Sequence, residues 1–409
     1  MMKRHVKVVV RLRLTSAFAQ DLIKFGEDKQ SVSVNIPRNV EYINNQPSKC
    51  DFKFDSVLNN TSQETLFEDC ALPVVKSLLD GFNGTVLAYG QTATGKTFTM
   101  TGATENYKQR GIIPRSISQI FKDISDRPTL EFTVKVSYLE VYNEQLVDLL
   151  VSDSKTHPLT VYEDKNGVHV KGLKVLLANN EEEALNMLFE GDTKRTCSAH
   201  QMNKFSSRSH CIFTIHVQSK SRIESADRVL VSKLNLVDLA GSERLSKTET
   251  SGATLKEAMY INRSLTYLEQ VIIALADKKR EHVPFRQSKL THVLRDSIGG
   301  NCNTLMIANI SGEQQNIDET IATLRFSTRM MCVAIDPQIN VHYDPMALVR
   351  KYEAEIKELK QELNMYDLLS NRGGRVIYET YNEVQKNELW KIIKAYIDSD
   401  SEELEVVFL

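Results

Sequence analysis

The chain has 409 residues and a mass of 46.5 kDa, and 41% of its residues are hydrophobic and 25% charged. This composition is typical of a globular protein with a sizeable core, and it excludes a disordered chain, a collagen and a coiled-coil rod. Lysine and arginine number 51 against 53 aspartates and glutamates, which gives a formal net charge of -2. No global basic field for nucleic acid exists, so any polyanionic partner must meet a local basic patch.

The six cysteines are too widely spaced to form a C-x-x-C metal or redox pair, which indicates a reducing compartment. The start of the chain is basic and then apolar, as in a signal peptide, but Lys7, Arg11 and Arg13 interrupt the apolar run. We therefore expect a first strand at residues 6–10. No run of about 18 uncharged apolar residues occurs, so we expect no membrane insertion.

Up to about residue 335, short apolar runs alternate with amphipathic stretches, which predicts a layered α/β domain. The expected strands cover residues 6–10, 85–89, 132–138, 211–217, 229–237 and 304–310. The expected helices cover residues 63–79, 114–123, 180–189, 255–275, 287–297 and 317–331. Pro114 supports the start of its helix, because a first helical turn tolerates proline.

After Asp336 the composition becomes more charged, and residues 344–365 predict a helix. Its apolar residues alternate in steps of three and four: Val349, Tyr352, Ile356, Leu359, Leu363 and Tyr366. This heptad spacing could pair two chains weakly through residues 349–366, but it is shorter than the roughly three to four heptads of a stable coiled coil. One amphipathic helix packed on its own domain is the alternative. A further helix is expected at residues 379–396.

A glycine-rich loop at residues 90–97 has the pattern G-x-x-x-x-G-K-T and directly follows the expected strand at 85–89. The backbone N–H groups of such a loop cradle phosphates, its lysine contacts the β- and γ-phosphate oxygens, and its threonine ligates magnesium. Lys96 and Thr97 stand at these two positions. The pattern therefore predicts a nucleotide site that uses Mg²⁺.

Two further segments suit the same site. An apolar strand ends at Asp238, where a carboxylate could hold the water shell of the metal, and Gly241 could offer its N–H to a γ-phosphate. Residues 203–210 concentrate hydroxyl and amide side chains around Arg208, which could bridge to a carboxylate and close a gate. Each segment alone could also be an ordinary turn or surface loop. The pairing of these segments with the phosphate loop gives them weight.

Together these segments resemble the phosphate-loop, switch I and switch II signatures of the kinesin motor domain. The resemblance covers residues 5 to about 340 and includes motifs at residues 138–144, 261–265, 282–291 and 324–327. Residues 101–108, 188–193 and 370–372 are most similar to the kinesin-nine family of cilia and flagella. The resemblance implies a protein of the cytoplasm and cytoskeleton, in the axoneme of a cilium or flagellum.

A kinesin implies a microtubule-stimulated ATPase that converts ATP hydrolysis into plus-end-directed movement. The implied fold is α/β: a kinesin-type P-loop NTPase motor with a central, mostly parallel, twisted β-sheet flanked by helices on both faces. The implied organisation is a motor domain (1–332), a neck linker (333–343), a neck helix or short coiled coil (344–369) and a C-terminal tail with one helix (370–409). The alternative function is a nucleotide-gated microtubule-binding tether with little productive motility. The net charge and the microtubule-binding motifs exclude a nucleic-acid motor.

The resemblance also assigns roles around ATP, ADP and Mg²⁺. Lys96 contacts the β- and γ-phosphates, and Gly241 senses the γ-phosphate. Thr97 and Ser207 hold Mg²⁺ directly, and Asp238 holds it through water.

Four further residues are assigned to the hydrolysis step. Arg208 and Glu243 form a salt bridge that closes the two switches, although a static surface ion pair is the alternative. Glu243 then accepts, through a second water, the proton of the attacking water. Asn203 and Ser206 help to position that water.

At the adenine end the family's Arg-x-Arg-Pro pattern is broken, because Leu14 stands in place of the proline. Phe98 should still stack on the base, so we expect ATP to bind with reduced base selectivity. Ala93 replaces a common glycine and would strain the turn or slow ADP release if a positive φ is required there. The expected nucleotide-binding residues are Arg11, Arg13, Leu14, Gly90, Gln91, Thr92, Ala93, Thr94, Gly95, Lys96, Thr97 and Phe98.

Basic residues follow the second switch and continue through the next helices. An ordinary solvated face would have the same composition, but a local basic stretch on a chain of charge -2 suits an acidic polymer such as tubulin and predicts salt-sensitive binding. The expected microtubule contacts are Lys247, Lys256, Arg263, Lys278, Lys279, Arg280, His282, Arg286, Lys289 and Arg295.

The segment at residues 333–341 resembles a neck linker placed after the motor, with Asn340 at the position of the family's asparagine latch. This placement implies plus-end-directed movement. A cover strand that pairs with the linker could only come from residues 1–5, so we expect a short one and a reduced stall force.

Overall fold

The computed structural model describes residues 4–13, 15–36, 49–103, 106–151, 158–164, 167–202, 208–222, 228–243, 253–277, 279–343, 345–369 and 383–398. The chain divides into two compact units, Met1–Pro345 and Met346–Leu409.

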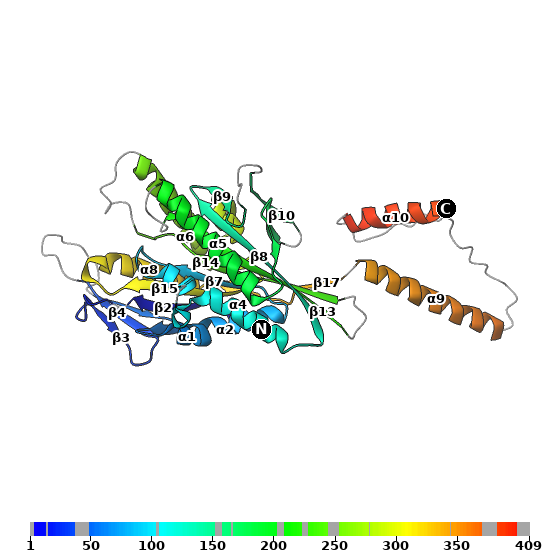
Figure 1. Cartoon of the computed structure of the whole chain (residues 1–409), viewed down its shortest axis with the longest axis horizontal. Helices are drawn as coiled ribbons and strands as arrows, with labels where there is room; N and C mark the ends of the chain where they lie inside the picture. The colour runs from blue at the N-terminus through cyan, green and yellow to red at the C-terminus, as the bar shows by residue number, and fades with distance from the viewer. Residues whose placement is uncertain are drawn as a thin grey trace. The chain divides into compact units, whose positions relative to one another are not determined.

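A ten-stranded sheet forms the centre of the first unit (Figure 1). Its main order is β12-β8-β13-β14-β7-β15-β2-β6, with β9 paired to β8 and β17 paired to β14. The strands are β2 (Lys7–Arg13), β6 (Ser56–Leu58), β7 (Gly84–Tyr89), β8 (Leu130–Tyr142), β9 (Gln145–Asp148), β12 (Leu176–Leu177), β13 (His210–Ser221), β14 (Arg228–Asp238), β15 (Asn303–Ser311) and β17 (Val341–Tyr343).

The sheet is mixed, and β14 marks the change of direction. From β14 through β7, β15 and β2 to β6, neighbouring strands are parallel. On its other side β14 pairs antiparallel with β13, and β13 pairs antiparallel with β8. All six strands expected from the sequence are present. The predicted α/β fold, with helices on both faces of a central sheet, is confirmed.

Helices cover both faces of the sheet, which is why its central strands are apolar throughout. In β7, Val86 and Ala88 join a core cluster with α2 (Leu72–Leu79), α4 (Ile112–Ser125) and α5 (Glu181–Met202). Leu87 and Tyr89 face the opposite way and pack with α6 (Ala253–Ala276) and α8 (Ile317–Met331).

The first expected helix is interrupted. It consists of α1 (Gln63–Leu66), a π-helical turn (Phe67–Ala71) and α2, which together span the predicted residues 63–79. Pro73 lies at the start of α2 and has no N–H for the regular ladder, which explains the irregular turn before it.

Two other helices differ in length from the prediction. α5 continues to Met202 because Gly191, which looks like a helix end, serves close packing: a Cβ there would overlap the Tyr138 ring. α7 (Lys289–Val293) is shorter than expected and follows a 3₁₀ turn (Phe285–Gln287). The remaining helical segments of this unit are α3 (Lys96–Met100) and 3₁₀ turns at Tyr107–Gln109 and Gln314–Asn316.

Three small sheets were not expected or only partly expected. β3 (Ile23–Phe25), β4 (Ser31–Asn35) and β5 (Lys49–Lys53) form an antiparallel sheet, and β10 (Thr160–Asp164) and β11 (Gly167–Lys171) form a hairpin. The third sheet joins β1 (Arg4–His5) to β16 (Ala334–Ile335), so the expected short cover strand is present. Farther along, β17 lies antiparallel on the start of β14.

The second unit contains α10 (Glu383–Asp398) and nearly all of α9 (Pro345–Leu369). The heptad side chains Tyr352, Ile356, Leu359, Leu363 and Tyr366 are exposed. Within the described residues, every helix is too short or too polar to cross a bilayer.

Candidate functional site

The loop between β7 and α3 is held in a conformation that only a few residue types adopt easily. Gly90 has a φ of 146°, and a Cβ on it would overlap the Asn309 carbonyl oxygen. Gly95 has a φ of 92° and caps α3. Ala93 has a φ of 65°, so the positive φ on which the expected strain depends is present.

Lys96 lies at the first position of α3 and is buried. Its ammonium donates to the carbonyl oxygens of Gly90 at 2.8 Å and Gln91 at 2.9 Å. Burial lowers the pKa of Lys96, and the carboxylates of Asp238 and Glu243 oppose this shift. The loop therefore holds a desolvated cation among oxygens, ready for an anionic ligand.

Asp238 ends β14 beside this lysine and is also buried. Its Oδ2 accepts from the Thr97 hydroxyl at 2.7 Å and from Arg195 at 3.2 Å. Its Oδ1 is buried and has no hydrogen-bond partner within the described residues. A carboxylate oxygen without a partner, next to a hydroxyl, suits Mg²⁺, which binds oxygen ligands and keeps several waters.

Gly241 follows β14 and leaves room for a contact between two loops. A Cβ on Gly241 would overlap Thr92 Oγ1 and the Glu243 carboxylate. Glu243 accepts from Thr92 N at 2.7 Å and from the Thr92 hydroxyl at 2.5 Å. Glu243 thus contacts the phosphate loop in this structure, and its closure onto Arg208 stays a prediction.

His210 connects the segments around the loop. Its Nδ1 accepts from Ala240 N at 3.0 Å, so its proton is on Nε2, which lies 2.8 Å from the Ser264 hydroxyl of α6. Burial, with the nearby charges of Lys96 and Arg195, lowers the pKa of His210 to about 3. The imidazole is therefore neutral and joins β13, the end of β14 and α6.

A cavity of about 670 Å³ opens beside the loop, lined by residues 92–99 together with Arg11, Arg13, Arg195 and Asp238. Arg11 donates to Thr99 Oγ1 at 2.8 Å and lies 5.7 Å from the centre of the Phe98 ring. Phe98 is 43% exposed, so its ring is available for stacking. Arg13 donates to the Ala93 carbonyl and supports the strained turn.

A family model described as the kinesin motor domain matches residues 18–333. The chain belongs to the kinesin motor family. Mouse kinesin-like protein KIF9 is 50% identical over 414 residues, which cover 100% of the chain and 52% of that protein. Kinesin-like protein KLP1 of Chlamydomonas reinhardtii is 48% identical, over 98% of the chain and 52% of that protein. The expected likeness to the kinesin-nine family is confirmed, and the chain spans about half the length of these relatives.

Solved kinesin structures share the fold. A structure of a fast kinesin is 38% identical with a TM-score of 0.73, covering 83% of the chain and 95% of that structure. A dimer of KIF14 residues 391–772, with AMP-PNP and a microtubule, is 33% identical with a TM-score of 0.73, over 83% of the chain and 97% of that structure.

The structure gathers most of the kinesin nucleotide residues expected from the sequence around one cavity. Gly90 and Gln91 shape the loop behind it, and Arg208 lies just before β13. Leu14, Asn203, Ser206, Ser207, Lys247 and Lys278 lie outside the described residues, and so does the side chain of Lys256.

Sequence reasoning missed Arg195, which is 6% exposed and contacts Asp238 from α5. The helix was expected to end at residue 189, so Arg195 was not placed on it. Leu188, Gly191 and Arg195 recur at steps of three and four, so all three lie on the buried face once the helix is extended past residue 189.

Several expected microtubule contacts lie on exposed loops. Lys279, Arg280 and His282 are exposed, and Arg280 pairs loosely with Asp277 at 3.8 Å. Arg263 is exposed on α6, and its guanidinium lies 5.5 Å from the centre of the Tyr267 ring.

The remaining expected contacts meet acidic side chains. The Glu163 carboxylate of β10 binds Arg286 and Arg295, and also His292, which was not among the expected contacts. These hydrogen bonds, of which the one from Arg286 has the largest effect, lower the pKa of Glu163 to about 2. The backbone of Lys289 donates to Glu144 at 2.8 Å. Sequence reasoning missed Glu163, which neutralises part of the basic set.

Asn340 lies between β16 and β17, in the segment expected to be the neck linker. Its backbone N–H and its side-chain amide both donate to the Gly81 carbonyl at 3.0 Å. Its backbone carbonyl accepts from Val231 N at 3.0 Å. This segment is thus attached to the turn after α2 and to β14.

Proposed function

We propose that this kinesin is a microtubule-stimulated ATPase that moves toward the plus end of microtubules. One observation carries the proposal. β14 ends at Asp238, beside the phosphate loop, and its first residues pair with β17 of the neck linker. The same strand therefore contacts the candidate ATP site and the segment whose movement would do work. A tight link between the two sites is what a motor requires.

The site suits ATP with Mg²⁺. Bound Mg²⁺ would neutralise charge on the β- and γ-phosphates during hydrolysis. Thr97 and Asp238 would hold it, the latter through water, with Ser207 completing the set. Lys96 would turn its ammonium from the Gly90 and Gln91 carbonyls toward the phosphates.

Hydrolysis requires a group that takes a proton from the attacking water. We assign this role to Glu243, which would leave Thr92 and close onto Arg208 when Gly241 moves toward the γ-phosphate. The water oxygen bonds to the γ-phosphorus, the bond to the β–γ bridging oxygen breaks, and the proton passes through a second water to Glu243. Asn203 and Ser206 would position the attacking water.

The adenine would lie at the other end of the cavity, on the Phe98 ring beside Arg11. Arg13 and Leu14 would border this end. Because leucine replaces the family's proline, we expect discrimination among nucleotide bases to be weaker than in other kinesins.

Microtubule binding would use the exposed basic loops. The acidic surface of tubulin would attract Lys279 and Arg280 first, because Arg286 and Arg295 already share Glu163. The microtubule in the KIF14 structure supports this partner class for the fold.

We assign residues 1–332 to the motor domain, 333–343 to the neck linker, 344–369 to the neck helix and 370–409 to the tail. The exposed heptad side chains of α9 support weak homodimerisation through residues 349–366. The kinesin-nine likeness supports a place in the cytoskeleton of the cytoplasm, in the axoneme of a cilium or flagellum.

The test is steady-state ATPase activity with and without stabilised microtubules, at two salt concentrations, beside a Lys96→Ala variant. Strong stimulation that fades with salt and is lost in the variant is expected. A chain that hydrolyses ATP equally well without microtubules would contradict the proposal.

A nucleotide-gated tether is the second candidate. Two observations favour it: the positive φ of Ala93, and a cover strand that pairs with the linker through only two residue pairs. A gliding assay separates the two functions. A tether would hold microtubules in an ATP-dependent way without moving them.

A further inference from the structure

The middle of the neck linker lies over a turn rather than in the main sheet. Between β16 and β17, Asp336 N donates to the Gly300 carbonyl at 3.3 Å, and Gln338 N donates to Asn301 Oδ1 at 2.6 Å. Both acceptors belong to the turn that precedes β15. This turn therefore holds the stretch between the two short linker strands.

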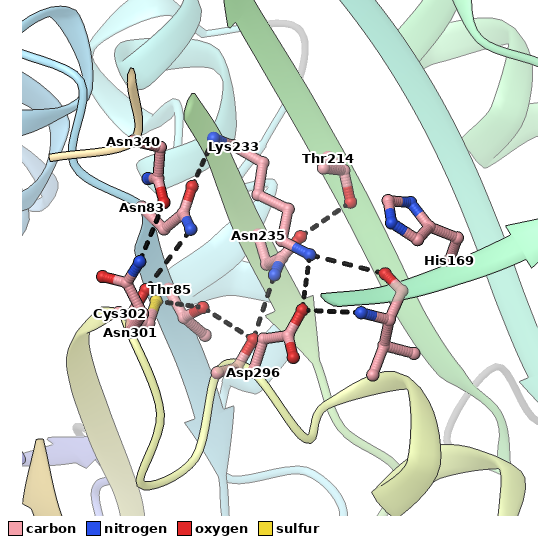
Figure 2. Close-up of polar contacts among 12 residues, drawn as sticks. Asn83, Thr85, His169, Thr214, Lys233, Asn235, Asp296, Asn301, Cys302 and Asn340 are labelled. Carbon is pink, nitrogen blue, oxygen red and sulfur yellow. Dashed lines mark hydrogen bonds and ion pairs between the residues drawn. The ribbon is translucent and has the colours of Figure 1, made fainter. Parts of the chain in front are cut away.

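The Asn301 side chain uses both ends of its amide on this segment. Its Oδ1 accepts from Gln338 N. Its Nδ2 donates to Asn340 Oδ1 at 2.8 Å (Figure 2). The donors of Asn340 are both directed at Gly81, so Asn301 provides the donor for the remaining Asn340 side-chain oxygen. The two contacts lie on either side of Ile339.

The turn is built independently of the linker. The Asn301 carbonyl accepts from Asn83 Nδ2 at 3.3 Å, and Asn83 Oδ1 accepts from Lys233 N of β14 at 3.0 Å (Figure 2). Gly299 has a φ of 78°, and a Cβ on Gly300 would lie 2.7 Å from the Asp296 carbonyl oxygen. The backbone thus presents Asn301 in one orientation, so little entropy is lost when the linker docks.

The neighbouring contact makes the register specific. Gly81 has a φ of 90°, and a Cβ on it would lie 2.9 Å from Ile339 Cγ2, so only glycine admits this side chain. A shift of the linker by one residue would bring Ile339 away from Gly81 and leave the Asn301 amide opposite the wrong backbone groups.

We propose that Asn301 is a second latch residue, a positioning residue that selects the register in which the neck linker docks. The proposal rests on the linker movement in the proposed function and deepens it. Asn340 hydrogen-bonds the Gly81 carbonyl, whereas Asn301 contacts the segment at two points, Gln338 and Asn340, and so distinguishes the docked register from a slipped one.

The test compares amide hydrogen exchange in Asn301→Ala, Asn301→Asp and the matched control Asn303→Ala. Asn303 lies two residues away, and its side chain contacts Ser77 at 3.2 Å rather than the linker. In Asn301→Ala the amides of Gln338 and Asn340 should exchange about tenfold faster, the ratio expected for two lost hydrogen bonds. The amides of β15 should be unchanged, which separates loss of the latch from loss of the fold.

Asn301→Asp sharpens the test. A carboxylate still accepts from Gln338 N but faces Asn340 Oδ1 without a proton to donate, so exchange at Asn340 should rise while Gln338 stays protected. Exchange at Gln338 and Asn340 that equals wild type in Asn301→Ala would overturn the proposal. A uniform rise in exchange across β15 would overturn it as well, since Asn301 would then serve the fold.

A double-variant cycle with Asn340→Ala tests the pairing. Because the two amides contact each other, the double variant should exchange no faster at Val231 than the more affected single variant. Additive effects would overturn the proposal. These measurements need no microtubules, so they separate failure of the latch from failure of the motor function, which ATPase stimulation tests by itself.

Discussion

The two ends of β14 hold contrasting sites. At the phosphate-loop end, Lys96, Arg195 and Asp238 are buried charges, and Asp238 Oδ1 has no partner within the described residues. At the linker end, the contacts of Asn301 and Asn340 are made by neutral amides and carbonyls. Binding a charged ligand tightly requires buried charges, whose desolvation is costly to the fold. A segment that binds reversibly can use neutral hydrogen bonds, whose net strength is modest.

The largest effect is expected when the charge is removed at the phosphate-loop end of β14 only. Lys96→Ala should reduce microtubule-stimulated ATPase activity by about 10²–10³-fold, because a preorganised donor to the phosphates is lost. Amide protection of the linker should not change. Lys76→Ala, at an exposed lysine of α2, is the control. Near-normal hydrolysis by the Lys96 variant would remove that lysine from the mechanism.

Salt should act on the microtubule contacts and leave the linker contacts alone. Raising the ionic strength from about 0.1 M to 1 M shortens the screening length from about 10 Å to 3 Å, and microtubule affinity should fall by about tenfold or more. The salt dependence should weaken in Lys279→Ala/Arg280→Ala, and less so in Arg286→Ala, which already pairs with Glu163. Co-sedimentation measures the binding, and hydrogen exchange measures the linker. Salt-sensitive exchange at Asn340 would contradict a neutral latch.

Acid should destabilise the phosphate-loop end through His210. The folded-state pKa of His210 is about 3, below the ordinary 6.5, so the unfolded chain binds a proton that the folded chain does not. Its contribution to stability is present above pH 6.5 and is lost as the pH falls toward 3. Between pH 6.5 and 5.5 the loss should be about 1 kcal/mol.

Denaturant unfolding at several pH values tests this assignment. His210→Gln should flatten the slope of stability against pH, whatever its effect on the level. Asn301→Ala, at the linker end, should leave the slope as in wild type. An unchanged slope in His210→Gln would show that other groups cause the acid sensitivity.

The smallest expected effect comes from the strained loop. Ala93→Gly should raise the free energy of unfolding by about 0.5–1 kcal/mol, because the left-handed conformation costs alanine more than it costs glycine. If strain also slows ADP release, the variant should bind ADP less tightly. Stopped-flow release of a fluorescent ADP measures this, and equal ADP affinity of the two proteins would separate the strain from nucleotide exchange.

Much of the nucleotide site was predictable because its residues follow strands. The pattern at residues 90–97 and the acidic end of β14 both lie at the carboxyl ends of parallel strands, which meet at one edge of the sheet. Residues that reach the site from elsewhere carry no such signal. Arg195 comes from a helix that continues through Gly191, and Asn309 reaches Thr99 from β15 at 2.9 Å.

The linker dock was less accessible to sequence reasoning for a different reason. Asn340 could be expected from its place in the family pattern, but Asn301 is one amide in a turn of small polar residues. Its contacts depend on two segments far apart in the chain, at Asn83 and at residues 338–340. Likewise the charge of Glu163 gives no hint that three basic residues over a hundred positions later surround it.

β14 pairs with β13 through ten consecutive residue pairs. Its 11 residues span roughly 35 Å. Sliding this strand by a single position would turn every inward side chain outward and break all ten pairs at once. Any motion passed between the phosphate loop and the segment at residues 333–343 would therefore have to move the paired strands together, rather than slide β14 along its own axis.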